Sequence, residues 1–238
     1  MTEQYRNITK TLVFIPTFND RELLNELTNE ILSLDENYDV FVIDDGSTPE
    51  IKPMNLIERY YFYRAPFNVG LGLITNIAIN FALFKKYDVL IRVDGDGQHN
   101  ISSLPLLENE IRKNNADFVI SNRVNQHLEN SLRNSIGNLI KLILTRLCNY
   151  FSNLEVEDWH SGMMAFSKEA MTTLKSHTLD KYPETEIIFF LKYKKLKIAT
   201  VDVTQQKRLF SSSTVTLFQA LRHVSKVLLL ILYYKFKG

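Results

Sequence analysis

Short apolar runs alternate with amphipathic segments along the first half of the chain. The apolar runs have the length of strands and cover residues 12–15, 38–43, 60–63 and 87–93. Two segments between them, 19–34 and 73–84, carry apolar residues at helical spacing. Strands separated by single helices predict a mostly parallel sheet with helices on its faces. The pattern therefore indicates one α/β domain.

Three of these runs end in polar segments, which are Pro16–Asp20, Asp44–Thr48 and Asp94–His99. In a parallel sheet the carboxyl ends of the strands lie along one edge, and ligands bind there. Core packing does not require three polar segments at that edge. We therefore expect a binding site that is built from all three.

The second half of the chain is less regular. We expect further strands at 117–121 and 197–203, a long apolar helix over 132–151, and a loop over 158–166 that runs into a strand. Residues 207–214 are polar and predict a linker or a loop. The sequence has no internal repeat and no linker that would separate two domains.

The C-terminal segment 216–238 predicts an amphipathic helix. Its residues 227–234 are apolar all round, which is much shorter than the roughly twenty residues of a membrane span. Such a helix either lies in a membrane interface or packs against the domain or a second copy of the chain, so a homodimer is one expectation. One polar stripe at helical spacing consists of Gln219, Arg222, His223 and Lys226.

Composition narrows the classes of protein. A chain of 238 residues with 45% hydrophobic residues is long enough for a sizeable core, and its net charge of +1 gives no reason to expect a nucleic-acid partner. The single cysteine, Cys148, excludes an internal disulfide and a cysteine-rich zinc site, and its apolar neighbours predict burial. The polar N-terminus has no apolar signal core, so we expect a cytoplasmic protein.

The most informative chemistry follows the fourth apolar run. Asp94 and Asp96 are two positions apart in an extended segment, so their carboxylates point the same way and can converge on one hard cation. The carbonyl of Gln98 is a third oxygen ligand, and the glycines Gly95 and Gly97 leave room for a phosphate. A magnesium or manganese ion held in this way suits a diphosphate leaving group. The alternative is a solvated Asp-Gly turn.

Two further motifs are candidates for binding a nucleotide. Asp44 and Asp45 stand where a strand meets a loop, and a carboxylate there can accept a hydrogen bond from a base or a ribose. The alternative is that Asp45 only satisfies backbone donors of the turn. Residues 68–72 (Asn-Val-Gly-Leu-Gly) begin a helix that would pack closely on the nucleotide. Their spacing is that of neither a dinucleotide-binding loop nor a P-loop.

Asp158 and three arginines are candidates for the acceptor side. A carboxylate placed at a reacting hydroxyl acts as a general base, and Asp158 stands in a polar cluster within an apolar context. Arg123, Arg133 and Arg208 each lie near an expected element of the rim, where converging guanidinium groups would bind a phosphate. The alternative is that these arginines are ordinary surface residues.

Taken together, these motifs resemble those of the family 2 glycosyltransferases, which have the Rossmann-like GT-A fold. The resemblance extends over roughly residues 10 to 215. It is nearest to the branch of dolichol-phosphate mannose synthase and the bacterial polyprenyl-phosphate sugar transferases. The residues that carry it are Ile15–Asn19, Val42–Ser47, Asn68–Gly70, Asp94–His99, Ser121–Arg123, Asp158–Gly162, and Arg208 with Ser211–Ser213.

The resemblance implies a GT-A domain over 1–215 and a C-terminal amphipathic helix over 216–238. It implies an inverting, metal-dependent enzyme that moves a sugar from a nucleotide-diphosphate sugar to a polyprenyl-phosphate or lipid-linked acceptor in cell-envelope glycan synthesis. Such an enzyme would lie at the inner face of the plasma membrane, with the C-terminal helix on the membrane.

The resemblance also implies roles for particular residues. The ligands of Mg²⁺ or Mn²⁺ would be Asp94, Asp96 and Gln98. The nucleotide sugar would be bound by Pro16, Thr17, Asn19, Asp44, Asp45, Asn68, Gly70 and Asp94. Catalysis would involve Asp96, Asp158 and Arg208. The acceptor phosphate would be bound by Arg123, Arg133 and Arg208.

Departures from the family pattern leave other functions open. The last element has Ser211 or Ser212 in place of its glycine, so the geometry on the acceptor side is open. The absence of a Gln-x-x-Arg-Trp motif argues against a processive synthase. The first alternative is an O-antigen or capsule transferase whose acceptor is a saccharide hydroxyl, with Asp158 as the base. A non-catalytic nucleotide-sugar-binding subunit is the second, although it would not need the pair of carboxylates. A sugar nucleotidyltransferase is the third, but Pro16–Asn19 stands where its glycine-rich loop would be.

Overall fold

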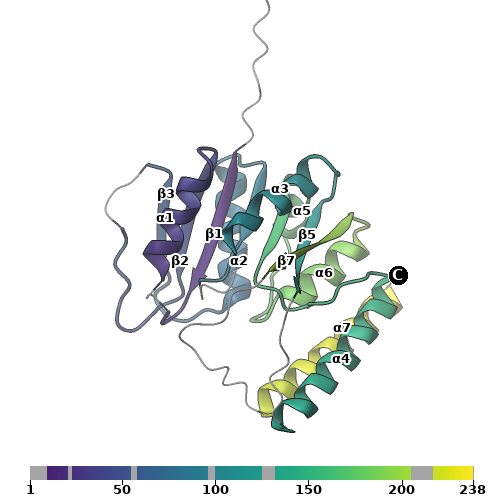
Figure 1. The fold of residues 1–238 in the computed structure, drawn as a ribbon. Helices are drawn as coiled ribbons and strands as arrows, with labels where there is room; N and C mark the ends of the chain where they lie inside the picture. The colour runs from purple at the N-terminus through teal and green to yellow at the C-terminus, as the bar shows by residue number, and fades with distance from the viewer. Residues whose placement is uncertain are drawn as a thin grey trace, which may run out of the picture.

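The computed structural model describes residues 10–20, 23–54, 58–95, 100–124, 132–204 and 217–237, and their side chains except those of 123–124, 132–141, 217–223 and 237. A seven-stranded sheet in the order β3-β2-β1-β4-β6-β5-β7 forms its centre (Figure 1). β6 is antiparallel to β4 and β5, and the other neighbouring pairs are parallel. The mostly parallel sheet predicted from the sequence is therefore confirmed. The strands are β1 (Thr11–Thr17), β2 (Tyr38–Asp44), β3 (Tyr60–Arg64), β4 (Val89–Arg92), β5 (Phe118–Val124), β6 (Met164–Ser167) and β7 (Ile198–Thr204).

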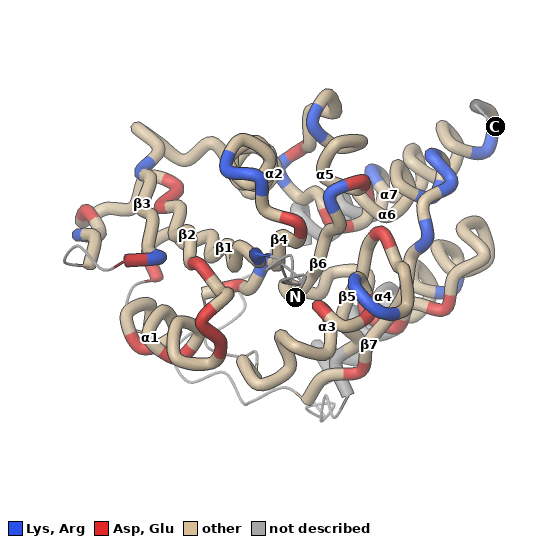
Figure 2. The backbone as a smooth tube through the Cα atoms, turned by 90° about the horizontal axis from the view of Figure 1, so that it is seen from above, with Lys and Arg blue, Asp and Glu red and all other residues tan. Residues whose placement is uncertain are grey.

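Helices cover both faces of the sheet (Figure 2). On one face lie α1 (Leu24–Leu34) and α3 (Leu104–Arg112), which follows a short 3-10 helix over Ile101–Ser103. On the other face lie α2 (Leu71–Phe84), α5 (Lys168–Leu174) and α6 (Glu184–Tyr193). Two long helices, α4 (Leu132–Ser152) and α7 (Leu217–Lys237), lie side by side, and α7 also packs on α6 (Figure 1).

The burial of the strands explains why the sequence shows unbroken apolar runs. Every residue of β2 is buried, because α1 and α2 cover its two faces, and a strand buried on both faces does not alternate in polarity. The edge strand β7 does alternate between partly buried and exposed positions over most of its length. Two apolar cores result, one on each face of the sheet.

The start of α1 differs from the prediction. The pair Asn19 and Glu22 resembles a capping box, but the helix begins at Leu24, its N-cap position is Leu23, and no side chain caps it. Asn19 instead has a positive φ of 57° and bonds the loop after β2, where its side chain accepts from the backbone N–H of Thr48 at 2.8 Å. An Asn followed three residues later by a Glu predicts a helix that begins at Asn19. That start is wrong, because this asparagine has a partner in another loop. Glu22 lies outside the described residues.

The C-terminal segment forms the predicted amphipathic helix, and one side of it docks on the domain. Val227 and Ile231 of α7 are buried in the core that also contains Cys148 of α4. At the C-terminal ends of the two helices, Lys235 Nζ lies 5.3 Å from the ring centroid of Phe151. None of the helices in the described ranges is long and apolar enough to span a bilayer. The expected partners of this helix were a membrane interface, the domain and a second copy of the chain, and the structure shows the contact with the domain.

Candidate active site

The three polar segments predicted to form a rim lie at neighbouring strand ends. β1 lies between β2 and β4 in the sheet, and the last residues of β1 and β2, Thr17 and Asp44, are partners in register. Arg92, the last residue of β4, pairs with Phe14, so Asp94 follows beside the end of β1. The parallel arrangement therefore brings the first two segments and the start of the third, Asp94 and Gly95, to one edge of the sheet, as predicted from the sequence.

Asp44 closes the turn after β2. It is fully buried, and its Oδ1 accepts from the backbone N–H of Ser47 at 2.9 Å. Its Oδ2 forms an ion pair with Arg64 Nη1 at 2.9 Å, and Arg64 Nη2 also donates to the Ser47 carbonyl at 3.1 Å. Arg64 is a residue that sequence reasoning missed. A buried carboxylate requires a partner. The one signal for Arg64 in the sequence is that it directly follows an apolar run, at the same edge of the sheet as Asp44.

Asp45 binds the loop that leads into α2. Its Oδ1 accepts from the backbone N–H of Val69 at 2.7 Å, and its Oδ2 accepts from Gly70 N–H and Asn68 Nδ2, both at 3.0 Å. Gly70 has a φ of 88°, a conformation that favours glycine. Residues from two motifs of the sequence, Asp45 from one and Asn68 and Gly70 from the other, therefore form one hydrogen-bonded cluster.

The loop after β1 is joined to this cluster. The backbone N–H of Asn19 donates to Ser47 Oγ at 2.8 Å, and Asp45 N–H donates to the Thr17 carbonyl at 2.8 Å. The Thr17 hydroxyl donates to the Asp20 carbonyl at 2.5 Å. Pro16 pairs in register with a residue of β2. The predicted nucleotide-binding residues of β1 and β2 thus belong to a single continuous piece of structure.

Asp94 lies between an arginine and a glycine. Arg92 is 1% exposed, and its Nε and Nη2 both donate to Asp94 Oδ1, at 3.0 and 2.9 Å. Its Nη1 donates to Oε1 of Glu184 at 2.9 Å. On the other side, a Cβ added at Gly162 would lie 2.0 Å from Asp94 Oδ2. Burial lowers the pKa of Arg92, but the two carboxylates outweigh it and raise this pKa above its ordinary value, so the guanidinium is charged.

Arg92 and Glu184 are the second place where sequence reasoning fell short. The sequence favours no more for Glu184 than a charge at a helix N-terminus, and it places Arg92 inside an apolar run. The available signal was an arginine within a strand that reads as buried, because a buried guanidinium needs carboxylate partners. The sequence could not have identified Glu184 as that partner, since it is far away in the chain.

Asp158 lies in a buried turn next to this centre. It is 3% exposed, its Oδ1 accepts from His160 N–H at 3.3 Å, and its carbonyl accepts from Ser161 N–H at 3.3 Å. The hydroxyls of Ser161 and Ser121 are 2.6 Å apart, which joins the turn to β5. Gly162 ends the turn against Asp94. The predicted Asp-x-x-Ser-Gly element is therefore adjacent to the predicted metal motif.

Several predicted residues cannot be placed. Asp96, Gln98 and Arg208 lie outside the described residues. The side chains of Arg123, in β5, and Arg133, in the first turn of α4, are also outside them. Within the described part of the chain, no group of three or more His, Cys, Asp or Glu side chains could hold a metal ion. The metal and acceptor-phosphate assignments stay predictions.

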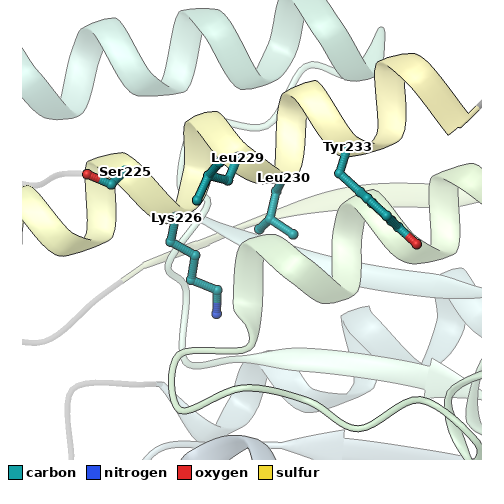
Figure 3. Close-up of a pocket in the computed structure, with 5 residues that line it drawn as sticks. All are labelled: Ser225, Lys226, Leu229, Leu230 and Tyr233. Atoms are coloured by element: carbon teal, nitrogen blue, oxygen red, sulfur yellow. The ribbon is translucent and has the colours of Figure 1, made fainter.

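An apolar cavity of about 410 Å³ lies elsewhere, along α7 (Figure 3). Lys226 and Leu230 point to the same side of the helix there. The cavity shares no residue with the rim. Its lining consists of Ser225, Lys226, Leu229, Leu230 and Tyr233.

Comparison with known proteins gives consistent matches. The profile of glycosyl transferase family 2 matches residues 12–175. The UDP-N-acetylglucosamine–dolichyl-phosphate N-acetylglucosaminyltransferase of Methanococcus voltae is 26% identical over 215 residues, covering 80% of this chain and 83% of that protein. The polyprenol monophosphomannose synthase of Mycolicibacterium smegmatis is 25% identical over 181 residues, covering 72% and 66%.

A solved structure confirms the fold predicted from the sequence. Glucosyl-3-phosphoglycerate synthase from Mycobacterium tuberculosis, in complex with Mn²⁺, UDP-glucose and phosphoglyceric acid, superposes with a TM-score of 0.66. The alignment has 16% identity and covers 95% of this chain and 79% of that chain. At this level of identity the likeness concerns the GT-A fold alone.

Proposed function

The chain belongs to glycosyl transferase family 2 and is a glycosyltransferase, and we propose that it moves a sugar from a nucleotide-diphosphate sugar to a polyprenyl-phosphate or other lipid-linked acceptor. The observation that carries this proposal is the rim itself, where the Asp45 cluster and Asp94 lie at neighbouring strand ends. Relatives named for transfer to dolichyl phosphate and for synthesis of polyprenol monophosphomannose support the acceptor class.

The donor would bind across the ends of β1 and β2. Pro16, Thr17 and Asn19 would line one side of the nucleoside, and the loop that begins α2 would line the other. Asp44 and Asp45 hold these loops in place through their backbone contacts. A preformed site of this kind binds with a smaller entropic cost than a loose one.

A divalent cation fits the donor atoms at the end of β4. Asp94 supplies a hard carboxylate oxygen, its side chain is 35% exposed, and its hydrogen bonds in the described ranges all fall on Oδ1. We propose that Asp94, Asp96 and Gln98 hold Mg²⁺ or Mn²⁺, and the Mn²⁺ in the fold neighbour supports this assignment. When bound, the ion would neutralise the charge of the leaving diphosphate.

The acceptor determines whether the chain must supply a base. The second pKa of a phosphate ester is about 6, so a lipid phosphate is already an oxyanion at neutral pH. Arg123, Arg133 and Arg208 would orient it for attack on the face opposite the leaving group, with inversion at the anomeric carbon. Asp158 is 3% exposed and bonded within its own turn, which supports an acceptor that needs no base. A saccharide hydroxyl would need one, and Asp158 would then supply it.

We further propose that residues 216–238 meet the inner face of the plasma membrane. The outward sides of α4 and α7 carry several exposed large apolar residues, and basic residues recur at that edge of the molecule (Figure 2). Apolar side chains rimmed by basic residues suit the interface of an anionic bilayer. The exposed apolar residues are Leu142, Ile143, Tyr150 and Phe151 of α4, and Leu228, Leu229, Leu232, Tyr233 and Phe236 of α7.

The test of the enzymatic proposal is release of nucleoside diphosphate in the presence of Mn²⁺ from UDP-, GDP- and dTDP-sugars, with and without polyprenyl phosphate. We expect the lipid to stimulate release and Asp96→Ala to abolish it, while Asp88→Ala, just before the other end of β4, retains it. Hydrolysis of the donor without stimulation by the lipid would favour a saccharide acceptor. A folded protein that binds and turns over none of these donors would contradict the proposal.

The membrane contact is tested separately by sedimentation with vesicles that contain phosphatidylglycerol. Leu229 of α7 and Leu106 of α3 are 66% and 49% exposed, and the two helices lie in different parts of the molecule (Figure 1). We expect Leu229→Glu to reduce the bound fraction and Leu106→Glu to leave it unchanged. Equal binding of the two variants would rule out this face, and a concentration-dependent dimer that Leu229→Glu dissociates would point to a second copy instead.

A further inference from the structure

Arg92, at the end of β4, is a charged residue in a buried position, so contact with water cannot account for its charge. Arg92 is 1% exposed, and it replaces the apolar residue that a buried strand normally has at such a position. Burying a guanidinium costs free energy unless carboxylates surround it. Its three described hydrogen bonds all go to carboxylates, two to Asp94 and one to Glu184.

These contacts restrain the orientation of the Asp94 carboxylate. Two N–H groups of Arg92 hold Oδ1, and the backbone at Gly162 is so close to Oδ2 that no side-chain carbon would fit between them. The carboxylate is therefore confined between a guanidinium and a main-chain segment. Rotation about its χ angles would break the ion pair with Arg92.

Glu184 fixes the other end of the guanidinium. It is the first residue of α6, is 7% exposed, and accepts from Arg92 Nη1 at 2.9 Å. The planar fork of an arginine can bind two carboxylates in fixed directions, which a lysine ammonium cannot do in the same way. The orientation of Asp94 is thus set by a helix far away in the sequence.

We propose that Arg92 and Glu184 are positioning residues that hold Asp94 Oδ1 so that Oδ2 is presented to the divalent cation. This inference rests on the proposed role of Asp94 as a metal ligand. Neither residue touches the substrate in it, and both act through Asp94. Partners that orient a metal ligand typically contribute about 10- to 100-fold in metal affinity or activity.

The experiment measures Mn²⁺ binding to the full chain by the loss of the free-ion electron paramagnetic resonance signal, with Mn²⁺ alone and with Mn²⁺ plus UDP. Arg92→Lys keeps the positive charge but not the fork, and we expect it to raise the Kd for Mn²⁺ about 10-fold or more. Glu184→Gln keeps an acceptor for Nη1 without its charge, and we expect a rise of about 3-fold. In turnover assays, the apparent KM for Mn²⁺ should rise more than kcat at saturating Mn²⁺ falls.

Two matched variants control for the loss of a multiply bonded arginine and of a buried glutamate. Arg59 donates to the carbonyls of Asp35, Tyr38 and Leu32 at 3.0 to 3.1 Å, which is a purely main-chain role. Glu186 lies in the same turn of α6 as Glu184 and is 8% exposed, but its partners are His177, Lys226 and the backbone N–H of Asp180. We expect Arg59→Lys and Glu186→Gln to leave the Kd for Mn²⁺ within about 2-fold of wild type.

The possible outcomes separate this inference from the proposed function. Folded Arg92→Lys and Glu184→Gln proteins with wild-type Mn²⁺ affinity would overturn the positioning role and leave the proposed function intact. A loss of affinity of the same size in the two control variants would also overturn it, because the effect would then be general. If Arg92→Lys does not fold, Glu184→Gln alone decides. A wild-type protein that binds no Mn²⁺, with or without UDP, would overturn the proposed metal site and this inference with it.

Discussion

Two corners of the rim use their carboxylates in opposite ways. At the end of β2, both oxygens of Asp45 accept hydrogen bonds from the loop before α2. At the end of β4, the hydrogen bonds of the Asp94 carboxylate among the described residues fall on Oδ1 alone, and come from Arg92. The first corner thus uses its charge to shape the protein. The second holds one oxygen and leaves the other beside the backbone of Gly162.

The contrast teaches that similar motifs can have different physical roles. Each corner is an aspartate followed by glycine at the carboxyl end of a strand. The Asp45 corner binds three donors of one loop, so its main contribution is the position of that loop. The Asp94 corner has a charged partner on one side and a glycine on the other, an arrangement that orients a ligand atom. Direct contact of Asp45 with the nucleoside stays a prediction.

The first turn of α6 supports both corners. Glu184 reaches Arg92 and through it Asp94. Glu186 accepts from the backbone N–H of Asp180 at 3.3 Å, and the Asp180 carbonyl packs against Gly72 of α2. The loop that leads into α2 is the loop that Asp45 binds. Two glutamates in one helical turn therefore stabilise two different parts of the rim.

The largest effect on activity is expected from one of two glycine substitutions, which together test whether the Asp94 corner and the Asp45 corner differ in role. An added Cβ would lie 2.0 Å from Asp94 Oδ2 at Gly162 and 2.0 Å from the Asp180 carbonyl at Gly72. In Gly162→Ala the Asp94 side chain can rotate away at the cost of its ion pair with Arg92, so the backbone need not shift and the ligand is displaced. We expect kcat/KM to fall about 100-fold, or about 2.7 kcal/mol of transition-state stabilisation. Nucleoside diphosphate release and Mn²⁺ binding measure it.

Gly72→Ala is the matched control for this variant. The clash there involves main-chain atoms of residues 179 and 180, which cannot rotate away, so the backbone itself must shift. We expect a larger fall in Tm than for Gly162→Ala, and an Mn²⁺ affinity near that of wild type. The comparison between the two corners would be wrong if both variants lost Mn²⁺ affinity equally.

The second effect tests the Asp45 corner through stability. Asp45 is 6% exposed, and an asparagine there presents one oxygen and an NH₂ group to three donors. Asp45→Asn therefore leaves a buried N–H without an acceptor, and we expect a loss of about 2 kcal/mol in the free energy of unfolding in urea. For a chain of this size that corresponds to a fall of about 4–8 °C in Tm.

Asp35→Asn provides the comparison for this variant. Asp35 also accepts from a backbone N–H and a side-chain amide, both of Asn37, but it is not fully buried. Water can replace the lost acceptor there, so the same change should cost much less. Equal costs at the two positions would show that Asp45 does not hold the loop.

The success of the sequence in locating the rim has a simple cause. Strands β1, β2 and β4 are buried on both faces, so their apolar runs are unbroken and their ends are visible as the first polar residues. Once the strands are parallel, the ends must meet at one edge. The three polar segments could therefore be predicted to lie together without knowledge of any contact.

The partners of the rim carboxylates could not be predicted in this way. Arg64 pairs with Asp44, and Glu184 pairs with Arg92, the arginine that holds Asp94. No periodicity relates residues that are so far apart in the chain. The same limit explains the incorrect capping box, because Asn19 has the residue type of a helix cap but bonds to Thr48 in another loop. The resemblance to a family implied that Asn68 and Gly70 are site residues, and the structure shows that both donate hydrogen bonds to Asp45.

A third and smaller effect tests how far the support of the Asp45 corner extends. Lys226 of α7 donates to the Tyr182 carbonyl at 2.7 Å and pairs with Glu186 Oε2 at 3.3 Å and Asp180 Oδ2 at 3.1 Å. We expect Lys226→Met to lower the free energy of unfolding by about 1 kcal/mol, because the pair with Glu186 is mostly buried. Lys235→Met, on the exposed end of the same helix, should cost less. If Lys226→Met costs no more than Lys235→Met, α7 is not part of this support.

The smallest effect concerns pH and the inner side of α7. Tyr234 stacks on Phe189 of α6, and burial, followed by the charge of Glu186, raises its pKa from 10.0 to about 12. The unfolded chain therefore loses this proton near pH 10 while the folded chain keeps it, so Tyr234 contributes stability that is complete below pH 10 and is lost as the pH rises to about 12. We expect urea unfolding to show a shallower loss of stability over this window in Tyr234→Phe than in wild type. The difference in absorbance at alkaline pH between the two folded proteins gives the pKa of Tyr234 directly. A value near 10 would mean that α7 does not enclose this ring, and that its support of the Asp45 corner ends at Lys226.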